Sequence, residues 1–141
     1  MKIAPLIARF LLGIIFFVFG LNGFFHFIPM APPAGLAGQF VGALFMSHFL
    51  VVVFALEVTG GLLLLSNRYV PLALTILGPV IVNIFLFHLF MEPGGLGMAI
   101  LVVILWTIAA LSSRKYFSGL FVRRTSGQLP SERPLMANGG I

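Results

Sequence analysis

The chain of 141 residues contains no cysteine, and charged residues make up only 8% of it. The absence of cysteine excludes disulfides, thiol redox chemistry and thiolate metal sites. Soluble domains carry about 25% charged residues, so this composition excludes an ordinary soluble domain. With 60% hydrophobic residues and a mean hydropathy of +1.17, the sequence indicates an integral membrane protein whose helices pack against one another in a lipid bilayer.

Acidic residues are also scarce, with 3 Asp and Glu against 8 Lys and Arg, which gives a net charge of +5. An excess of basic residues in a soluble chain would suggest nucleic acid as a partner. Here the basic residues flank apolar runs, which is typical of the positive-inside rule for membrane proteins. We therefore expect the bilayer, and no nucleic acid, as the partner of this chain.

Four apolar runs predict an all-α fold, an integral membrane four-helix bundle. The first run is longer than the hydrophobic region of a signal peptide, so we interpret it as an uncleaved span. Residues 1–113 form the predicted membrane domain, and residues 114–141 form a basic, largely disordered cytoplasmic tail. The predicted spans cover residues 5–28, 47–66, 70–90 and 96–112.

A proline-rich break at residues 29–35 separates the first span from the apolar residues 36–46. Joined to the next span, residues 36–46 would give a helix of about 45 Å, whereas a bilayer core needs only about 20 residues. We therefore predict a short interfacial or re-entrant helix here, with one long tilted helix as the alternative.

The basic residues have an uneven distribution along the chain. They lie at the amino terminus, in the second turn and in the carboxyl tail, whereas the first and third turns contain no Lys or Arg. Four spans with both termini in the cytoplasm satisfy all of these positions.

Glu57 lies near the middle of the second predicted span, where a carboxylate costs roughly 2.5–3.5 kcal/mol on insertion scales. Three interpretations remain open. Arg9 can form an ion pair with Glu57, a protonated Glu57 can bond to the backbone, or Glu57 can serve in proton movement or ligand binding. Asn83, in the third span, is a further intramembrane polar candidate.

Polar side chains near the outer ends of three predicted spans form a second group of candidates. Imidazole can ligate haem or a metal, or hydrogen-bond a quinone carbonyl, although the spacing here matches no known motif. The alternative is that these are interfacial residues bonded to water or to turns. The candidates for cofactor or quinone binding are Asn22, His26, His48 and His88.

Several short patterns resemble the DoxX-like family of membrane proteins over residues 6–112. Residues 9–13, followed by Phe16 and Gly20, are similar to the family's opening, and residues 57–64, with Arg68 after the span, are similar to its second-helix signature. His88 near the end of the third span is a further similarity. Such proteins often carry a Lys where this chain has Asn22, so the resemblance does not imply a cation at this position.

The resemblance implies a four-helix bundle in a bacterial-type inner membrane and a link to quinone-dependent oxidation, because the family is named after a subunit of a thiosulfate:quinone oxidoreductase. We therefore expect an accessory subunit of a membrane-bound oxidoreductase or other membrane complex, near a quinone or haem. One alternative is a small proton-coupled carrier that uses Glu57, and another is a non-catalytic assembly subunit. The sequence contains no nucleophile–base pair and no metal-ligand spacing, so a standalone enzyme has the least support.

Overall fold

The computed structural model describes residues 2–121, and these residues are helical with no strand, which confirms the all-α fold class. The predicted tail contributes two short 3-10 turns, and its remainder, from residue 122, lies outside the described residues. The helices are α1 (Ile3–Phe25), α2 (Gly35–Met46), α3 (Phe49–Leu65), α4 (Val70–Phe90), η1 (Pro93–Gly95), α5 (Leu96–Ser112), η2 (Arg114–Tyr116) and η3 (Ser118–Phe121).

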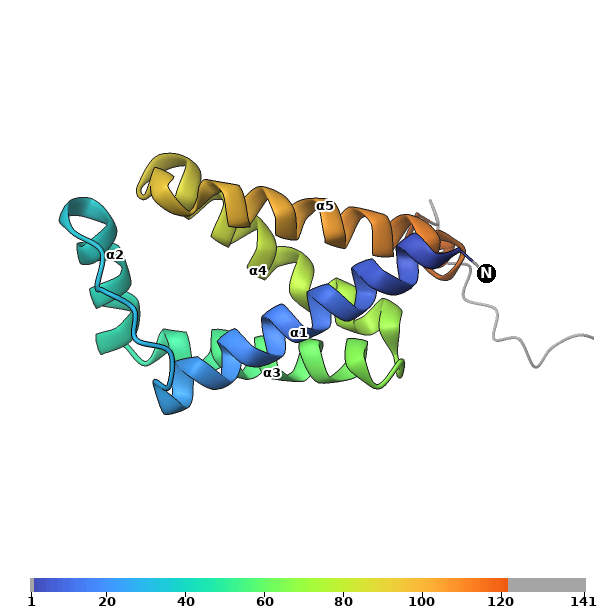
Figure 1. The fold of residues 1–141 in the computed structure, drawn as a ribbon, viewed down its shortest axis with the longest axis horizontal. Helices are drawn as coiled ribbons and strands as arrows, with labels where there is room; N and C mark the ends of the chain where they lie inside the picture. The colour runs from blue at the N-terminus through green and yellow to red at the C-terminus, as the bar shows by residue number, and fades with distance from the viewer. Residues whose placement is uncertain (1, 122–141) are drawn as a thin grey trace, which may run out of the picture.

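Four long helices form a bundle in which each helix contacts two neighbours. Helix α1 packs against α3 and α5, and α4 packs against the same two helices. The chain alternates in direction from one long helix to the next, so the amino terminus and the end of α5 lie at the same end of the bundle (Figure 1). Helix α2 lies at the opposite end, beside the start of α3 (Figure 1).

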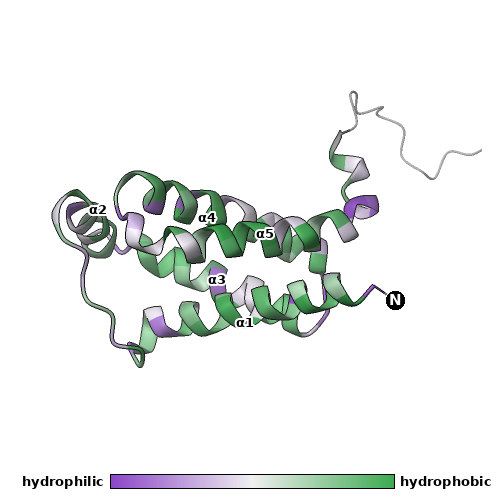
Figure 2. Ribbon diagram, turned by 45° about the horizontal axis from the view of Figure 1, so that its top comes forward, coloured by the Kyte–Doolittle hydropathy of each residue, from purple (hydrophilic) through white to green (hydrophobic). Residues whose placement is uncertain are grey.

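The surface of the bundle is as apolar as its interior. Three helices are long and apolar enough to cross a membrane, and the pair α2 and α3 adds a fourth crossing if it is counted as one span. Hydrophobic residues cover most of the helices (Figure 2), and large apolar side chains such as Ile14 and Ile104 are about half exposed. Helices that are apolar all round belong in a bilayer, so the predicted membrane bundle is confirmed.

Helix α2 is separate from α3, and the two axes differ by 86°. Helix α2 ends at Met46, and His48 adopts a left-handed backbone conformation, with φ of +62°. A residue in this conformation cannot continue a right-handed helix. The alternative of one long tilted helix is therefore wrong, and α3 is left with 17 residues, a length of about 26 Å.

Helices α1 and α3 approach each other closely because glycines face the neighbouring backbone. A Cβ atom at Gly61 would lie 2.5 Å from the Phe17 nitrogen and 2.9 Å from the Gly13 carbonyl oxygen. Gly20 similarly faces the backbone of Val58. Small residues permit such backbone contact between membrane helices, so these glycines fix how α1 and α3 align.

We predict that Gly61→Ala lowers the free energy of unfolding by about 1–3 kcal/mol, because the new methyl group would push against the α1 backbone. Gly42, in the middle of α2, is the control because a Cβ atom there would meet nothing within 4 Å. Gly42→Ala should be neutral or stabilise the protein by up to about 1 kcal/mol. Thermal or denaturant unfolding in detergent, followed by circular dichroism, measures both changes, and equal effects would contradict the close contact.

Candidate functional site

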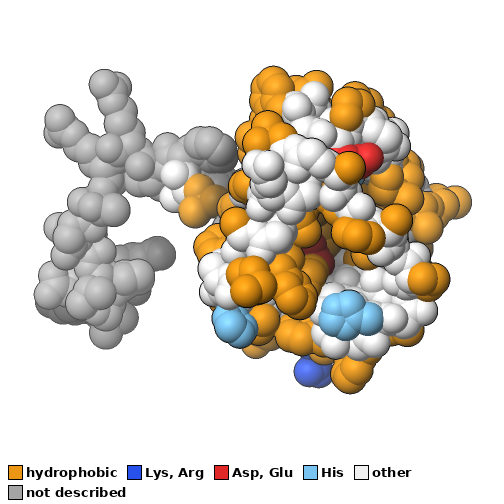
Figure 3. Space-filling view, turned by 90° about the vertical axis from the view of Figure 1, so that its left-hand side faces the viewer, with side chains coloured by type: hydrophobic (Ala, Val, Ile, Leu, Met, Phe, Trp, Pro, Cys, Tyr) orange, Lys and Arg blue, Asp and Glu red, His pale blue; other side chains and the backbone are white. Residues whose placement is uncertain are grey.

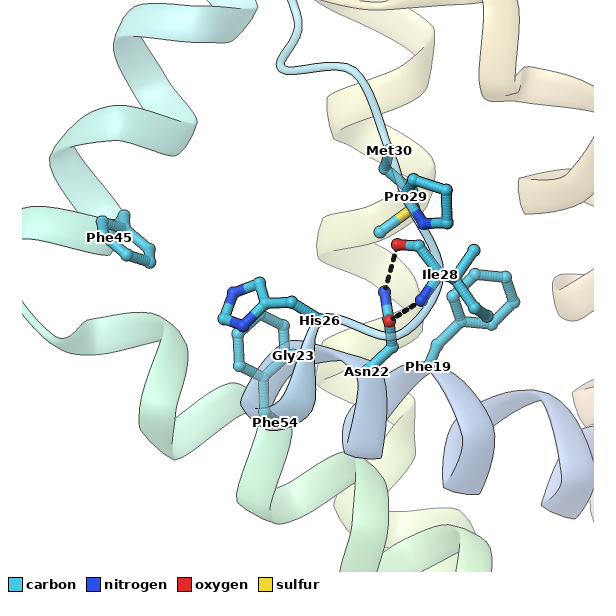
Figure 4. Close-up of a pocket in the computed structure, with 9 residues that line it drawn as sticks. All are labelled: Phe19, Asn22, Gly23, His26, Ile28, Pro29, Met30, Phe45 and Phe54. Carbon is cyan, nitrogen blue, oxygen red and sulfur yellow. Dashed lines mark hydrogen bonds between the residues drawn. The ribbon is translucent and has the colours of Figure 1, made fainter.

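A pocket of about 320 Å³ lies where the end of α1, the loop that follows it, and the corner between α2 and α3 meet (Figure 4). We call it the corner pocket. Three phenylalanine rings and one imidazole contribute to its mostly apolar wall, and the side chains able to donate a hydrogen bond are those of Asn22 and His26. Its lining residues are Phe19, Asn22, Gly23, His26, Ile28, Pro29, Met30, Phe45 and Phe54.

Asn22 shapes this pocket through the backbone of Ile28. Its Nδ2 donates to the Ile28 carbonyl oxygen at 3.3 Å, and the Ile28 N–H donates to its Oδ1 at 2.6 Å (Figure 4). The side chain is buried, with 2% of its surface exposed. Each end of the carboxamide bonds the Ile28 backbone, so Asn22 holds the loop in place, and its second Nδ2 hydrogen has no partner in residues 2–121.

His26 ends α1 and adopts the left-handed conformation, with φ of +53°. This conformation turns the chain away from the helix axis, and the imidazole extends into the space between α1 and the α2–α3 corner (Figure 4). The residue is exposed, and its ring makes no hydrogen bond to any side chain or backbone group of residues 2–121. His26 is thus available to a ligand in the corner pocket.

The other two histidines lie at the same end of the bundle but outside the corner pocket. His48 is exposed at the corner between α2 and α3. The Nδ1 atom of His88 lies 3.2 Å from the Glu92 carboxylate and 2.9 Å from the Glu92 carbonyl oxygen, so it secures the turn after α4. Within the described part of the chain, no three His, Asp or Glu side chains gather as metal ligands would.

Glu57 is buried in the bundle, with 7% of its surface exposed. Its Cβ faces Gly20 of α1, and the next turn of α3 packs against Leu77 of α4 through Gly60. Across residues 2–121 its carboxylate has no ion pair or hydrogen bond. Figure 3 looks onto the α2 end of the bundle and shows a hollow with an acidic side chain deep inside it. A carboxyl group held this way in a membrane protein is a functional candidate by its energetic cost alone.

Arg9 does not reach Glu57. Its Nη1 donates to the Leu64 carbonyl oxygen near the end of α3. Leu64 is seven residues beyond Glu57, which is about 10 Å along the helix. A cation at the carboxyl end of a helix interacts favourably with the unpaired carbonyls and the helix dipole, so Arg9 anchors the start of α1 to the end of α3.

Asn83 lies outside both the pocket and the hydrophobic core. It is exposed on α4, where its Nδ2 donates to the Pro79 carbonyl oxygen at 2.9 Å. The structure thus places the intramembrane polar candidates in three different locations.

The sequence interpretation missed the aromatic wall of the corner pocket. Phe19 of α1 lines the pocket together with Phe45 and Phe54. These three residues come from three helices, and no spacing in the sequence relates them. A second missed contact is the hydrogen bond of 2.9 Å from the Trp106 indole to the Leu74 carbonyl oxygen, which links α5 to α4.

Comparison with known proteins gives one match. A family model described as DoxX matches residues 4–89, which include α1, α2, α3 and most of α4. Neither the curated proteins nor the solved structures give a significant match.

A double-mutant cycle tests the separation of Arg9 from Glu57. Because Arg9 bonds the Leu64 carbonyl, about 10 Å along α3 from Glu57, we expect Arg9→Gln and Glu57→Gln to change the free energy of unfolding additively, within about 0.5 kcal/mol. Arg9→Gln alone should cost about 1–3 kcal/mol, because the Leu64 carbonyl loses a charged donor. A coupling energy above about 1.5 kcal/mol would show that the two side chains form an ion pair.

Proposed function

This chain belongs to the DoxX family, and we propose that it is an accessory subunit of a membrane-bound oxidoreductase that binds a quinone in the corner pocket. The observation that carries this proposal is the combination of three phenylalanine rings and the His26 imidazole around one space. The family link to quinone-dependent oxidation, stated above as an implication of the resemblance, points to the same class of ligand.

The chemistry of the pocket suits a quinone head group. The ring is flat and apolar, and aromatic side chains pack against such a ring by stacking or edge contacts. The quinone carbonyl oxygens are acceptors, and the imidazole N–H of His26 can donate to one of them. The pocket volume of about 320 Å³ lies at the small end of the range for ligand pockets, roughly 300–1,000 Å³. A haem is larger than a quinone head group, and His26 is the single histidine among the lining residues that could ligate its iron.

The open side of the pocket faces the apolar surroundings of the bundle. Met30 and Phe45 line the pocket and are 64% and 60% exposed. An isoprenoid tail can therefore continue from the pocket along apolar side chains into the bilayer. A bound quinone would supply the capacity to take up electrons and protons, while this chain would hold and orient its ring.

The electrons must come from another subunit under this proposal. The chain has no cysteine for a thiolate-bound cluster, and the described residues contain no group of three metal-ligating side chains. We therefore infer that the chain works in a complex whose other members carry the redox chemistry.

We further infer that the bundle lies in a bacterial-type inner membrane and that its basic residues set its orientation there. Lys2, Arg68 and Arg114 flank helix ends that meet on the amino-terminal side, and Arg9 lies in the second turn of α1 on the same side. The positive-inside rule assigns that side to the cytoplasm. The corner pocket then lies in the outer half of the membrane.

His26→Asn tests the proposal, with His48→Asn as the matched control. Asn tolerates the left-handed conformation that both histidines adopt, so each backbone should be preserved. We expect His26→Asn to weaken quinone binding by about tenfold, because the shorter side chain removes the imidazole ring from the pocket wall and withdraws its N–H from the ligand, and His48→Asn to leave it unchanged. Two measurements follow binding. The first is the amount of ubiquinone and menaquinone that each variant retains after gentle purification. The second is isothermal titration calorimetry with a short-chain quinone.

Equal affinities in both variants would contradict a quinone in the corner pocket. If the purified protein retains no quinone but reconstituted vesicles show proton-coupled flux that Glu57→Gln abolishes, the carrier function replaces the subunit function. Buried Glu57, without a partner in residues 2–121, is the observation that supports this second candidate.

A further inference from the structure

Helix α4 presents an outer face that no other helix of the described chain covers. Its members are separated by three or four residues, which places them on one side of the helix. The buried residues of α4, including Leu74 and Leu77, lie on the opposite side. We call the exposed set the outer face of α4, and its members are Thr75, Pro79, Val82, Asn83 and Leu86.

Asn83 differs from the threonines on the exposed faces of the long helices. Thr59, Thr75 and Thr107 each donate their one hydroxyl hydrogen to the carbonyl oxygen four residues earlier, at 2.7–2.8 Å. Asn83 also bonds back, from Nδ2 to the Pro79 carbonyl oxygen. A carboxamide has two N–H groups and one acceptor oxygen. After this bond, Asn83 therefore retains one N–H and its Oδ1, for which residues 2–121 supply no partner.

Asn83 lies at a position along α4 where leaving this N–H and Oδ1 without a hydrogen-bond partner costs free energy. Helix α4 runs from Val70 to Phe90, so Asn83 is three residues from the middle of the helix, about 5 Å along its axis. No water reaches an outward-facing group at this depth of a bilayer, and unsatisfied polar groups there are strongly disfavoured. Asn side chains in membrane helices accordingly bond across to a neighbouring helix.

We propose that the outer face of α4 is the interface between two copies of this chain, paired through their Asn83 carboxamides. Two copies inserted in the same direction are related by a two-fold axis along the membrane normal, so each residue of α4 meets its counterpart at the same depth. A carboxamide both donates and accepts, and it is therefore complementary to its own image. A second copy therefore presents its own Asn83 carboxamide at the same depth in the bilayer.

The shape and charge of the outer face fit the same occupant. Pro79 and Thr75 are compact side chains, about one and two helical turns from Asn83, and they allow a second helix to approach. The face contains no Lys, Arg, Asp or Glu, so it offers no charge that would select a partner of opposite sign. The interface also leaves the corner pocket free, because the outer face of α4 and the pocket share no residue.

The absence of cysteine from the chain allows a clean crosslinking test. Val82→Cys places one thiol on the outer face, at a residue that is 56% exposed. Ile14→Cys is the control, because Ile14 is 47% exposed on α1 and lies at the middle of its helix. In native membranes treated with copper phenanthroline, we expect a disulfide-linked dimer from Val82→Cys and none from Ile14→Cys, since a disulfide requires Cα atoms within about 7 Å.

Variants at Asn83 then test the carboxamide pair itself. Combined with Val82→Cys, Asn83→Leu should lower dimer association by roughly 3- to 30-fold, as measured by the crosslinked fraction over a series of dilutions in lipid. Asn83→Gln retains a carboxamide and should restore most of the crosslinking, which separates loss of the pair from loss of the fold.

Three results would overturn the proposal. The first is equal crosslinking from the two cysteine positions. The second is no crosslinking from Val82→Cys, which would leave lipid as the occupant of the face. The third is an adduct of Val82→Cys with a different protein in place of the dimer.

Discussion

The close contact between α1 and α3 determines how the polar side chains of these two helices lie relative to one another. Because Gly61 faces the Phe17 backbone and Gly20 faces Val58, the two antiparallel helices can align in one register only. This register puts Arg9 beside Leu64 and Gly23 beside Phe54. Lipid provides no hydrophobic driving force between helices, so backbone approach through small residues has to supply both the affinity and the alignment.

The same register divides the bundle into regions with different chemistry. The amino-terminal end contains Arg9 bonded to the end of α3, the interior contains Glu57, and the α2 end contains the corner pocket. The hollow of Figure 3 opens at the pocket end and extends toward the buried acidic side chain. A ligand in the corner pocket and a proton-exchanging group in the interior could thus share access from one side of the membrane, whereas the outer face of α4 stays available for assembly.

The sequence predicted the features that depend on composition and on local breaks. Four apolar runs, the proline-rich loop and the surplus length of residues 36–66 were enough to predict the bundle and the separate α2. The sequence could not show whether Arg9 reaches Glu57, because the sequences of two helices do not specify how the helices align with each other. The corner pocket was equally inaccessible, since it depends on left-handed residues at His26 and His48 and on rings from three helices. Asn22 was identified as a candidate ligand residue, yet only the folded loop shows that Ile28 occupies its carboxamide.

Photolabelling with an azidoquinone in native membranes would test the central claim most directly. The account predicts that light attaches the label to residues 19–30 of α1 and its loop, or to residues 45–54 at the α2–α3 corner, and that excess unlabelled quinone prevents it. Mass spectrometry of the digested protein locates the adduct. Label that is confined to α4 and α5, or that resists competition by quinone, would contradict a quinone site at the corner pocket.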